Sequence, residues 1–201
     1  MEWRITIDNQ ILRLIIPVPP SVNHYLSYRA IMKNRKPMAM SYKTPEAVKY
    51  QKELIKYIQS EVEKQNWVMS ENKFQHYYMD CDFYFNRTDM DANNYFKIPA
   101  DSITDSKCVW IDDTQLCERV NSIHYDTINP RIELVIFPVN YIGIFSDVPQ
   151  LESFKSNCIQ CSRYKNGKCS LLTRALEGRI QPEIVSSVCN SYKNKNNKEN
   201  T

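Results

Sequence analysis

Apolar and polar residues alternate in several short stretches of the chain, which is the pattern of half-buried β-strands. The clearest stretch is residues 76–85, HYYMDCDFYF, where every second residue is apolar and two aspartates fall on the opposite face. Residues 116–126 and 131–139 have a similar pattern, and we expect them to form adjacent strands. The β-branched runs at 2–8 and 11–18 predict a hairpin or two neighbouring strands.

Two other stretches have helical features. Thr44 is placed as a helix cap and Pro45 as the first helical residue, and apolar residues then recur at helical spacing until the helix ends near Asn66. A second helix is expected within residues 93–105, where Pro99 would delay its start because proline donates no backbone hydrogen bond. Together these elements predict an α+β fold in which a small mixed sheet packs against two helices.

Composition divides the chain into three parts. Hydrophobic residues make up 42% of the 201 residues, enough for a folded domain, which we place at residues 1–140. Residues 141–192 differ in composition and contain four cysteines, and residues 193–201 are expected to be a disordered tail. The apolar run at 11–18 is too short to span a bilayer and contains Arg13, so we expect no membrane association and a cytoplasmic protein.

The charge pattern bears on nucleic-acid binding. The net charge is only +3, so contacts to phosphates would have to come from a local basic cluster. Residues 28–43 have no clear period and predict a loop that is positively charged throughout. The candidate DNA-binding residues are Arg29, Lys33, Arg35, Lys36 and Lys43, with Asn23 and His24 as secondary candidates. The alternative is a loop whose charges only aid solubility.

Acidic side chains gather at two points of the predicted domain. Asp89, Asp91 and Asn93 lie between the strand at 76–85 and the following helix, and Asp112 and Asp113 precede the next strand. Hard Mg²⁺ held by such carboxylates activates water for phosphodiester hydrolysis. Helical spacing would place Lys97 on the same side as the acids. Turns and a helix cap explain the same residues equally well, and spacing alone does not decide between the two interpretations.

Four of the seven cysteines follow the spacing C-x2-C-x7-C-x19-C at Cys158, Cys161, Cys169 and Cys189. The first pair has the spacing at which one turn presents two sulfurs to a single metal, and four thiolates suit tetrahedral Zn²⁺. An iron–sulfur cluster uses the same ligands, and a disulfide pair or unused thiols remain possible interpretations. The expected C-terminal unit is therefore a small cysteine-rich, metal-binding appendage, with a helix in SLLTRALEGRI and a second in PEIVSSVC.

The order of motifs resembles the RusA family of Holliday junction resolvases. The resemblance covers most of the first 140 residues and includes PVPPSVNHYL, the basic segment, YKTPEAVKYQKE, the pattern D-x-N-N-x-x-K-x-x-x-D and WIDDTQ. It implies a small α+β fold and a dimeric, Mg²⁺-dependent endodeoxyribonuclease. Such an enzyme cuts four-way DNA junctions by paired nicks in recombination and repair. The cysteine-rich part lies outside the resemblance.

The resemblance also implies roles for single residues. Asp91 matches the first metal-binding aspartate, Asp113 matches the third essential acid, and Lys97 would neutralise charge that develops on the phosphate. Asn93 stands where a second aspartate is expected, and its amide can bind Mg²⁺ but adds no charge, so Asp89 and Asp112 are reserve ligands. Two alternatives remain: a catalytically silent DNA-binding or regulatory protein that recognises its target through the cysteine module, and a general nuclease for branched DNA.

Overall fold

The computed structural model describes residues 10–195, which divide into two compact units. The larger unit contains residues 10–73 and 77–137, and the C-terminal unit contains residues 74–76 and 138–195. The strand predicted at 2–8 and the end of the predicted tail, 196–201, lie outside the described residues. No helix between residues 10 and 195 is long and apolar enough to cross a membrane.

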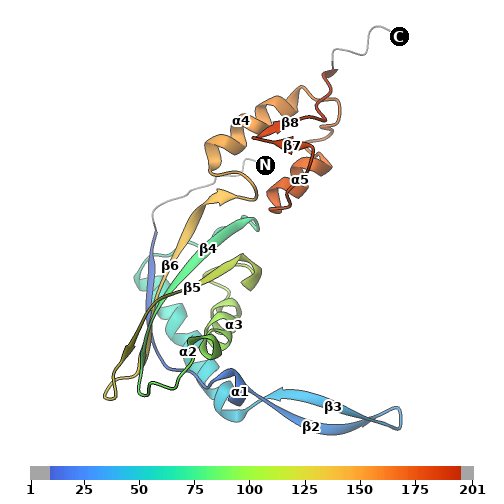
Figure 1. Cartoon of the computed structure of the whole chain (residues 1–201). Coiled ribbons are helices and arrows are strands. Elements are labelled where there is room, and N and C mark those ends of the chain that lie inside the picture. Colours follow the sequence, from blue (N-terminus) through green and yellow to red (C-terminus); the bar gives the residue numbers. More distant parts are fainter. Residues whose placement is uncertain (1–9, 196–201) are drawn as a thin grey trace. The chain divides into compact units, whose positions relative to one another are not determined.

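A four-stranded mixed sheet organises the larger unit (Figure 1). Its strands are β1 (Leu12–Pro17), β4 (Gln75–Phe85), β5 (Leu116–Tyr125) and β6 (Arg131–Ile142), in the order β1-β6-β4-β5. Strand β1 is antiparallel to β6, whereas β5 is parallel to β4. The prediction that the last two strands are adjacent is therefore wrong, because β4 lies between them. Parallel pairing requires a long crossover, and the helical segment between β4 and β5 supplies it.

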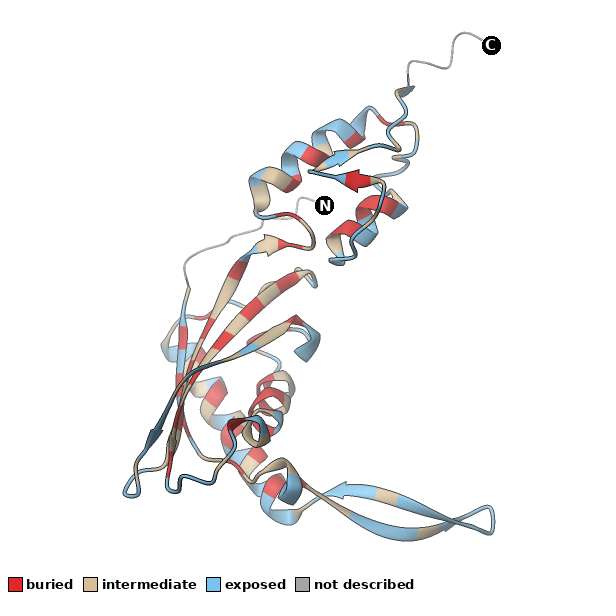
Figure 2. Cartoon of the chain, viewed as in Figure 1, coloured by how far each residue is buried: buried red, intermediate tan, exposed pale blue. Residues whose placement is uncertain are grey.

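The core of the larger unit lies between this sheet and two helices, α2 (Pro45–Lys64) and α3 (Lys97–Ser106). The predicted alternation of β4 is confirmed. The apolar residues on one face of the strand are completely buried, and the residues on its other face, which include two aspartates, are partly exposed (Figure 2). These buried residues pack with Leu54 and Ile58 of α2 and with Ile103 of α3. The expected α+β architecture, a mixed sheet with two helices, is confirmed.

Both helices begin as their sequences dictate. The side chain of Thr44 accepts a hydrogen bond from the backbone N–H of Ala47, and Pro45 occupies the first turn of α2, as predicted. The second helix begins at Lys97, after a short 3-10 helix, η1 (Ala92–Tyr95). Pro99 therefore falls in the first turn of α3, where backbone N–H groups have no partner within the helix and the missing donor costs little.

The basic segment is a β-hairpin, which corrects the prediction of a loop. After the short helix α1 (Val22–Tyr25), strands β2 (Leu26–Lys33) and β3 (Lys36–Lys43) pair in antiparallel register. Asn34 and Arg35 both have positive φ, as two-residue hairpin turns of type I′ require. Most of the hairpin is exposed on both faces, so its sequence lacks the alternation of a half-buried strand (Figure 2).

The C-terminal unit has a small core of its own. It contains α4 (Val148–Ile159), α5 (Ser170–Leu176), β7 (Ile184–Val185) and β8 (Val188–Cys189), with Phe145, Phe154 and Leu171 among the buried residues. Helix α5 ends shortly before Gly178, as predicted. The second predicted helix is wrong: Ser186 and Ser187 have positive φ, and β-branched residues pair on either side of that turn.

Backbone hydrogen bonds of this unit include residues at the start of the predicted tail. The backbone carbonyl of Lys193 accepts a hydrogen bond from the N–H of Ser162 at 2.7 Å, and the N–H of Lys195 donates to the carbonyl of Gln160 at 2.9 Å. Residues 193–195 are thus hydrogen-bonded to the segment that follows α4.

Candidate active site

The segment WIDDTQ between α3 and β5 is held by a buried tryptophan and by several hydrogen bonds. Trp110 is completely buried, and its Nε1–H donates to Oγ1 of Thr104 at 2.7 Å. The next residues form the 3-10 helix η2 (Asp113–Gln115), which begins with a reciprocal capping box. Asp112 Oδ1 accepts hydrogen bonds from the backbone N–H and the hydroxyl of Thr114, while Gln115 Oε1 accepts from the backbone N–H of Asp112.

The two neighbouring aspartates therefore have different environments. Hydrogen bonds from the Thr114 hydroxyl and backbone hold the pKa of Asp112 below its usual value, since they stabilise the charged form. Asp112 is thus a helix-capping residue. Asp113, one position later, lines a cavity of about 210 Å³ together with Lys97, Ala100, Leu116 and Glu118.

Glu118 is a residue that the sequence analysis missed. It lies on β5 and faces the same cavity as Asp113. Partial loss of water raises the pKa of its carboxyl, Lys97 opposes that rise, and Asp113 adds to it. The one available signal in the sequence was its position, five residues after Asp113 at the start of a predicted strand.

The side chain of Lys97 is about half exposed, but an ion pair holds its ammonium group in place. Its Nζ lies 2.7 Å from Oδ1 of Asp101, one helical turn later. The other oxygen of Asp101, Oδ2, accepts a hydrogen bond from the hydroxyl of Tyr25 at 2.7 Å. The hydrogen bond to Asp101 raises the pKa of Lys97, and the charges of Asp101, Asp113 and Glu118 act in the same direction. Lys97 is therefore a cation at neutral pH, fixed beside two further carboxylates.

The acidic segment after β4 lies outside the lining of this cavity. Asp91 caps η1, because its Oδ1 accepts the backbone N–H of Asn93 at 3.0 Å. Asp89 pairs with Arg87 at 3.2 Å, and both side chains are largely exposed. Asp89, Asp91 and Asn93 do not line the cavity. Within residues 10–195, no three His, Cys, Asp or Glu side chains are close enough to coordinate one metal ion. That Asp91 and Asp113 bind the same metal ion stays a prediction.

Comparison with known families bears on these residues. The family profile described as endodeoxyribonuclease RusA matches residues 17–137, which is more than half of the chain. The chain belongs to the RusA family. It is accordingly an enzyme that acts on DNA. The matched residues include the Asp113–Glu118 cavity and exclude most of the C-terminal unit. No curated protein gives a significant match to the chain.

The β2–β3 hairpin of the RusA segment gathers basic side chains. The register pairs Lys33 with Lys36 across the strands, and residues of β2 two or four positions apart share a face. Arg29, Lys33 and Lys36 thus lie on the same face, and the Arg29 guanidinium lies 5.7 Å from the ring centre of Tyr42. Arg35 is in the turn. These predicted DNA-binding residues are all exposed.

The base of the hairpin is tied to the region of Lys97. Lys43 donates to Oε1 of Gln51 at 2.8 Å, and its Nζ lies 5.4 Å from the ring centre of Tyr25, the residue that bonds Asp101. Lys43 is therefore anchored within the unit, unlike Lys33. The secondary candidates Asn23 and His24 lie in α1 and are exposed, and His24 Nδ1 is 3.2 Å from the Ser21 hydroxyl.

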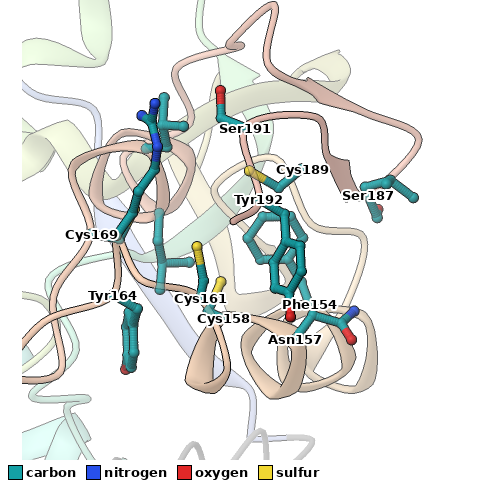
Figure 3. Close-up of a pocket in the computed structure, with 14 residues that line it drawn as sticks. Phe154, Asn157, Cys158, Cys161, Tyr164, Cys169, Ser187, Cys189, Ser191 and Tyr192 are labelled. Carbon is teal, nitrogen blue, oxygen red and sulfur yellow. The ribbon is translucent and has the colours of Figure 1, made fainter. Parts of the chain in front are cut away.

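The four cysteines of the C-terminal unit line one cavity of about 380 Å³ (Figure 3). All four have free thiols. Burial raises the pKa of Cys158 to about 11, and the neighbouring Cys169, Cys189 and Cys161 add to the effect. Burial acts in the same direction at Cys161, but backbone N–H groups of Lys193, Arg163 and Tyr164 outweigh it and lower the pKa of that thiol. The cysteines are therefore electrostatic neighbours.

Proposed function

We propose that the chain is a Mg²⁺-dependent endonuclease that cuts four-way DNA junctions by paired nicks, in DNA recombination and repair. The proposal depends chiefly on one observation: Asp113, Glu118 and Lys97 share a cavity inside the segment that matches the RusA family. Two carboxylates beside a fixed cation provide the oxygen ligands and the positive charge that phosphodiester hydrolysis requires.

The residues of this cavity fit a hard divalent ion. Mg²⁺ binds oxygen ligands, retains several waters and is often held by only one or two carboxylates together with phosphate oxygens of the substrate. We assign Asp113 and Glu118 as its principal ligands, with Asp91 and Asn93 as further ligands and Asp89 and Asp112 in reserve. When bound, the ion would make a ligated water more acidic and polarise the phosphate.

Lys97 has a separate role in this proposal. Its ammonium group would stabilise negative charge on the phosphate, and because Asp101 holds it in place, little reorganisation is needed as that charge develops. Asp101 and Tyr25 are thus positioning residues, since they act through Lys97. The side chains of Asp113 and Glu118 would hold the metal ion, and their carboxylates would orient the attacking water.

Cutting a junction symmetrically requires two active sites. A four-way junction has four strands, and paired nicks in two opposite strands follow when two copies of one site are related by a twofold axis. We therefore propose that the chain acts as a homodimer on branched DNA.

The experiment that tests the function compares DNA substrates. The full chain is incubated with a synthetic four-way junction, a single flap and a linear duplex of the same sequence, with Mg²⁺ or with a chelator. We expect Mg²⁺-dependent, symmetric cuts in the junction and little cutting of the duplex. Binding without cutting under any divalent ion would favour the silent DNA-binding alternative, and equal cutting of flap and junction would favour a general branched-DNA nuclease.

The hairpin gives a further prediction. Replacing both Lys33 and Lys36 by alanine should weaken junction binding and reduce the slope of log K against log salt by up to about 1.8, if each lysine neutralises one phosphate. The slope is measured by fluorescence anisotropy over a series of salt concentrations. A matched variant removes two exposed lysines of α2, Lys52 and Lys56. An equal loss of affinity in both variants would contradict a specific role of the hairpin.

A further inference from the structure

Three separate segments bring the four cysteines to one place in the C-terminal unit. Cys158 lies in the last turn of α4, Cys161 follows in the adjoining turn, Cys169 caps α5, and Cys189 lies on β8. The chain thus returns twice to the same cavity after leaving Cys161. Figure 3 shows the sulfurs of Cys158 and Cys161 next to each other, with the sulfur of Cys189 beside the same cavity.

The backbone around Cys161 is arranged to stabilise a negatively charged sulfur. The backbone N–H of Lys193 donates to Sγ at 3.5 Å, and the nearby backbone N–H groups of Arg163 and Tyr164 also lower the pKa of this thiol. The turn that makes these donors available is closed by hydrogen bonds from Cys161 N–H to the Cys158 carbonyl and from Tyr164 N–H to the Cys161 carbonyl. N–H donors favour a thiolate, which is the form of cysteine that binds metals.

A group of neighbouring thiolates requires a cation. Four negative sulfurs around a partly apolar cavity, lined also by Phe154 and Leu172, would repel one another and lose hydration. A divalent ion removes this cost by taking up the electron pairs of the sulfurs as the thiol protons are released to solvent. The cavity is not strongly basic enough to do so itself, since Arg163 is the one Lys or Arg among its lining residues.

We propose that Cys158, Cys161, Cys169 and Cys189 bind one zinc ion in a tetrahedral four-sulfur site. Among residues 10–195, no three cysteine side chains are positioned to hold one metal ion. Zinc binding therefore requires some of these side chains to change their χ1 rotamer. Rotation about χ1 alone moves a cysteine sulfur between staggered positions, and Zn–S bonds of about 2.3 Å fix the final spacing. The site is structural, because four protein ligands leave no open position for a substrate.

The site would hold together elements that are short by themselves. Strands β7 and β8 have two residues each, and α5 has seven. A bound zinc ion joins them to α4 and contributes to the folding energy of the unit. The inference is independent of the proposed nuclease activity, since the four cysteines lie outside the segment that matches the RusA family.

The test measures metal content and geometry of the full chain. Protein prepared without affinity metals is analysed by elemental mass spectrometry, and we expect about one zinc per chain, as a single four-sulfur site requires. Replacement of zinc by Co²⁺ should give the visible absorption of tetrahedral cobalt thiolate. Stoichiometric iron with the absorption of a cluster, or disulfides among these cysteines in freshly reduced protein, would overturn the assignment to zinc.

Substitution locates the site. Cys169→Ser should weaken Zn²⁺ binding by at least about 100-fold, whereas Cys117→Ser, on strand β5 of the larger unit, should leave it unchanged. If Cys169→Ser does not fold, alkylation of the unmodified chain tests the site instead. Bound zinc should protect the four cysteines from alkylation, and a chelator should make all four reactive together. Zinc content unaffected by Cys169→Ser, or alkylation unaffected by the chelator, would contradict the proposal.

Discussion

Asp113→Asn is expected to reduce the cleavage of four-way DNA by at least about 100-fold, the scale lost when one group that stabilises charge in a preorganised site is removed. The substitution keeps the size of the side chain and an oxygen ligand but removes the negative charge, so Mg²⁺ would be held more weakly beside Glu118 and Lys97. Glu118→Gln should reduce cleavage in the same direction, by roughly 10- to 100-fold. Initial rates are measured on labelled junctions at saturating protein.

Asp105→Asn is the matched control for this prediction. Asp105 lies on α3 outside the cavity, and its Oδ2 accepts a hydrogen bond from Gln51 that an asparagine oxygen can also accept. Cleavage by this variant should equal that of the unmodified chain. Junction binding by Asp113→Asn should persist, since the basic hairpin is unchanged. Full cleavage by Asp113→Asn would remove Asp113 from the active site.

Trp110→Ala is expected to destabilise the larger unit by about 3–5 kcal/mol, the cost of removing a fully buried large aromatic side chain. The indole is completely buried, its ring centre lies 6.1 Å from that of Tyr77, and the substitution also deprives Thr104 Oγ1 of its donor. The free energy of unfolding is measured by urea denaturation.

Unfolding is followed by the fluorescence of Trp67, so that the measurement reports on the larger unit. Trp67 lies in the same core, and replacing Trp3 by phenylalanine in both proteins removes the third tryptophan from the signal. Trp110→Phe should lose less stability than Trp110→Ala, because much of the ring volume is kept. A loss below about 1 kcal/mol for Trp110→Ala would show that the surrounding core closes over the gap.

Elements with one buried face were predictable from the sequence. The alternation in β4 and the apolar spacing in α2 follow directly from burial against a common core, and Thr44 and Pro45 mark a helix start through their own chemistry. The hairpin β2–β3 was missed because both faces are exposed. The sequence did not show that β4 lies between β5 and β6, because the pairing of a strand depends on how all strands of the sheet pack and not on the sequence of that strand alone.

The sequence predicted the types of residue in the candidate site, but not which of them lie together around the cavity. The sequence placed Asp112 and Asp113 together, yet the capping box turns one of them toward the backbone of η2 while the other lines the cavity. Glu118 was missed because its direction depends on how β5 leaves η2. The four cysteines were grouped by their spacing, and the structure places all four around one cavity.

The location of the divalent ion tests the account most directly. Fe²⁺ placed in the Mg²⁺ site reduces added hydrogen peroxide to hydroxide and a hydroxyl radical, and added ascorbate returns the iron to Fe²⁺. The radicals cut the nearest backbone, and mass spectrometry of the fragments identifies the cut positions. We predict cuts within residues 113–118 that disappear in Asp113→Asn and are competed by excess Mg²⁺. Cuts confined to residues 89–93, with none within 113–118, would contradict the assignment of Asp113 and Glu118 as the principal ligands.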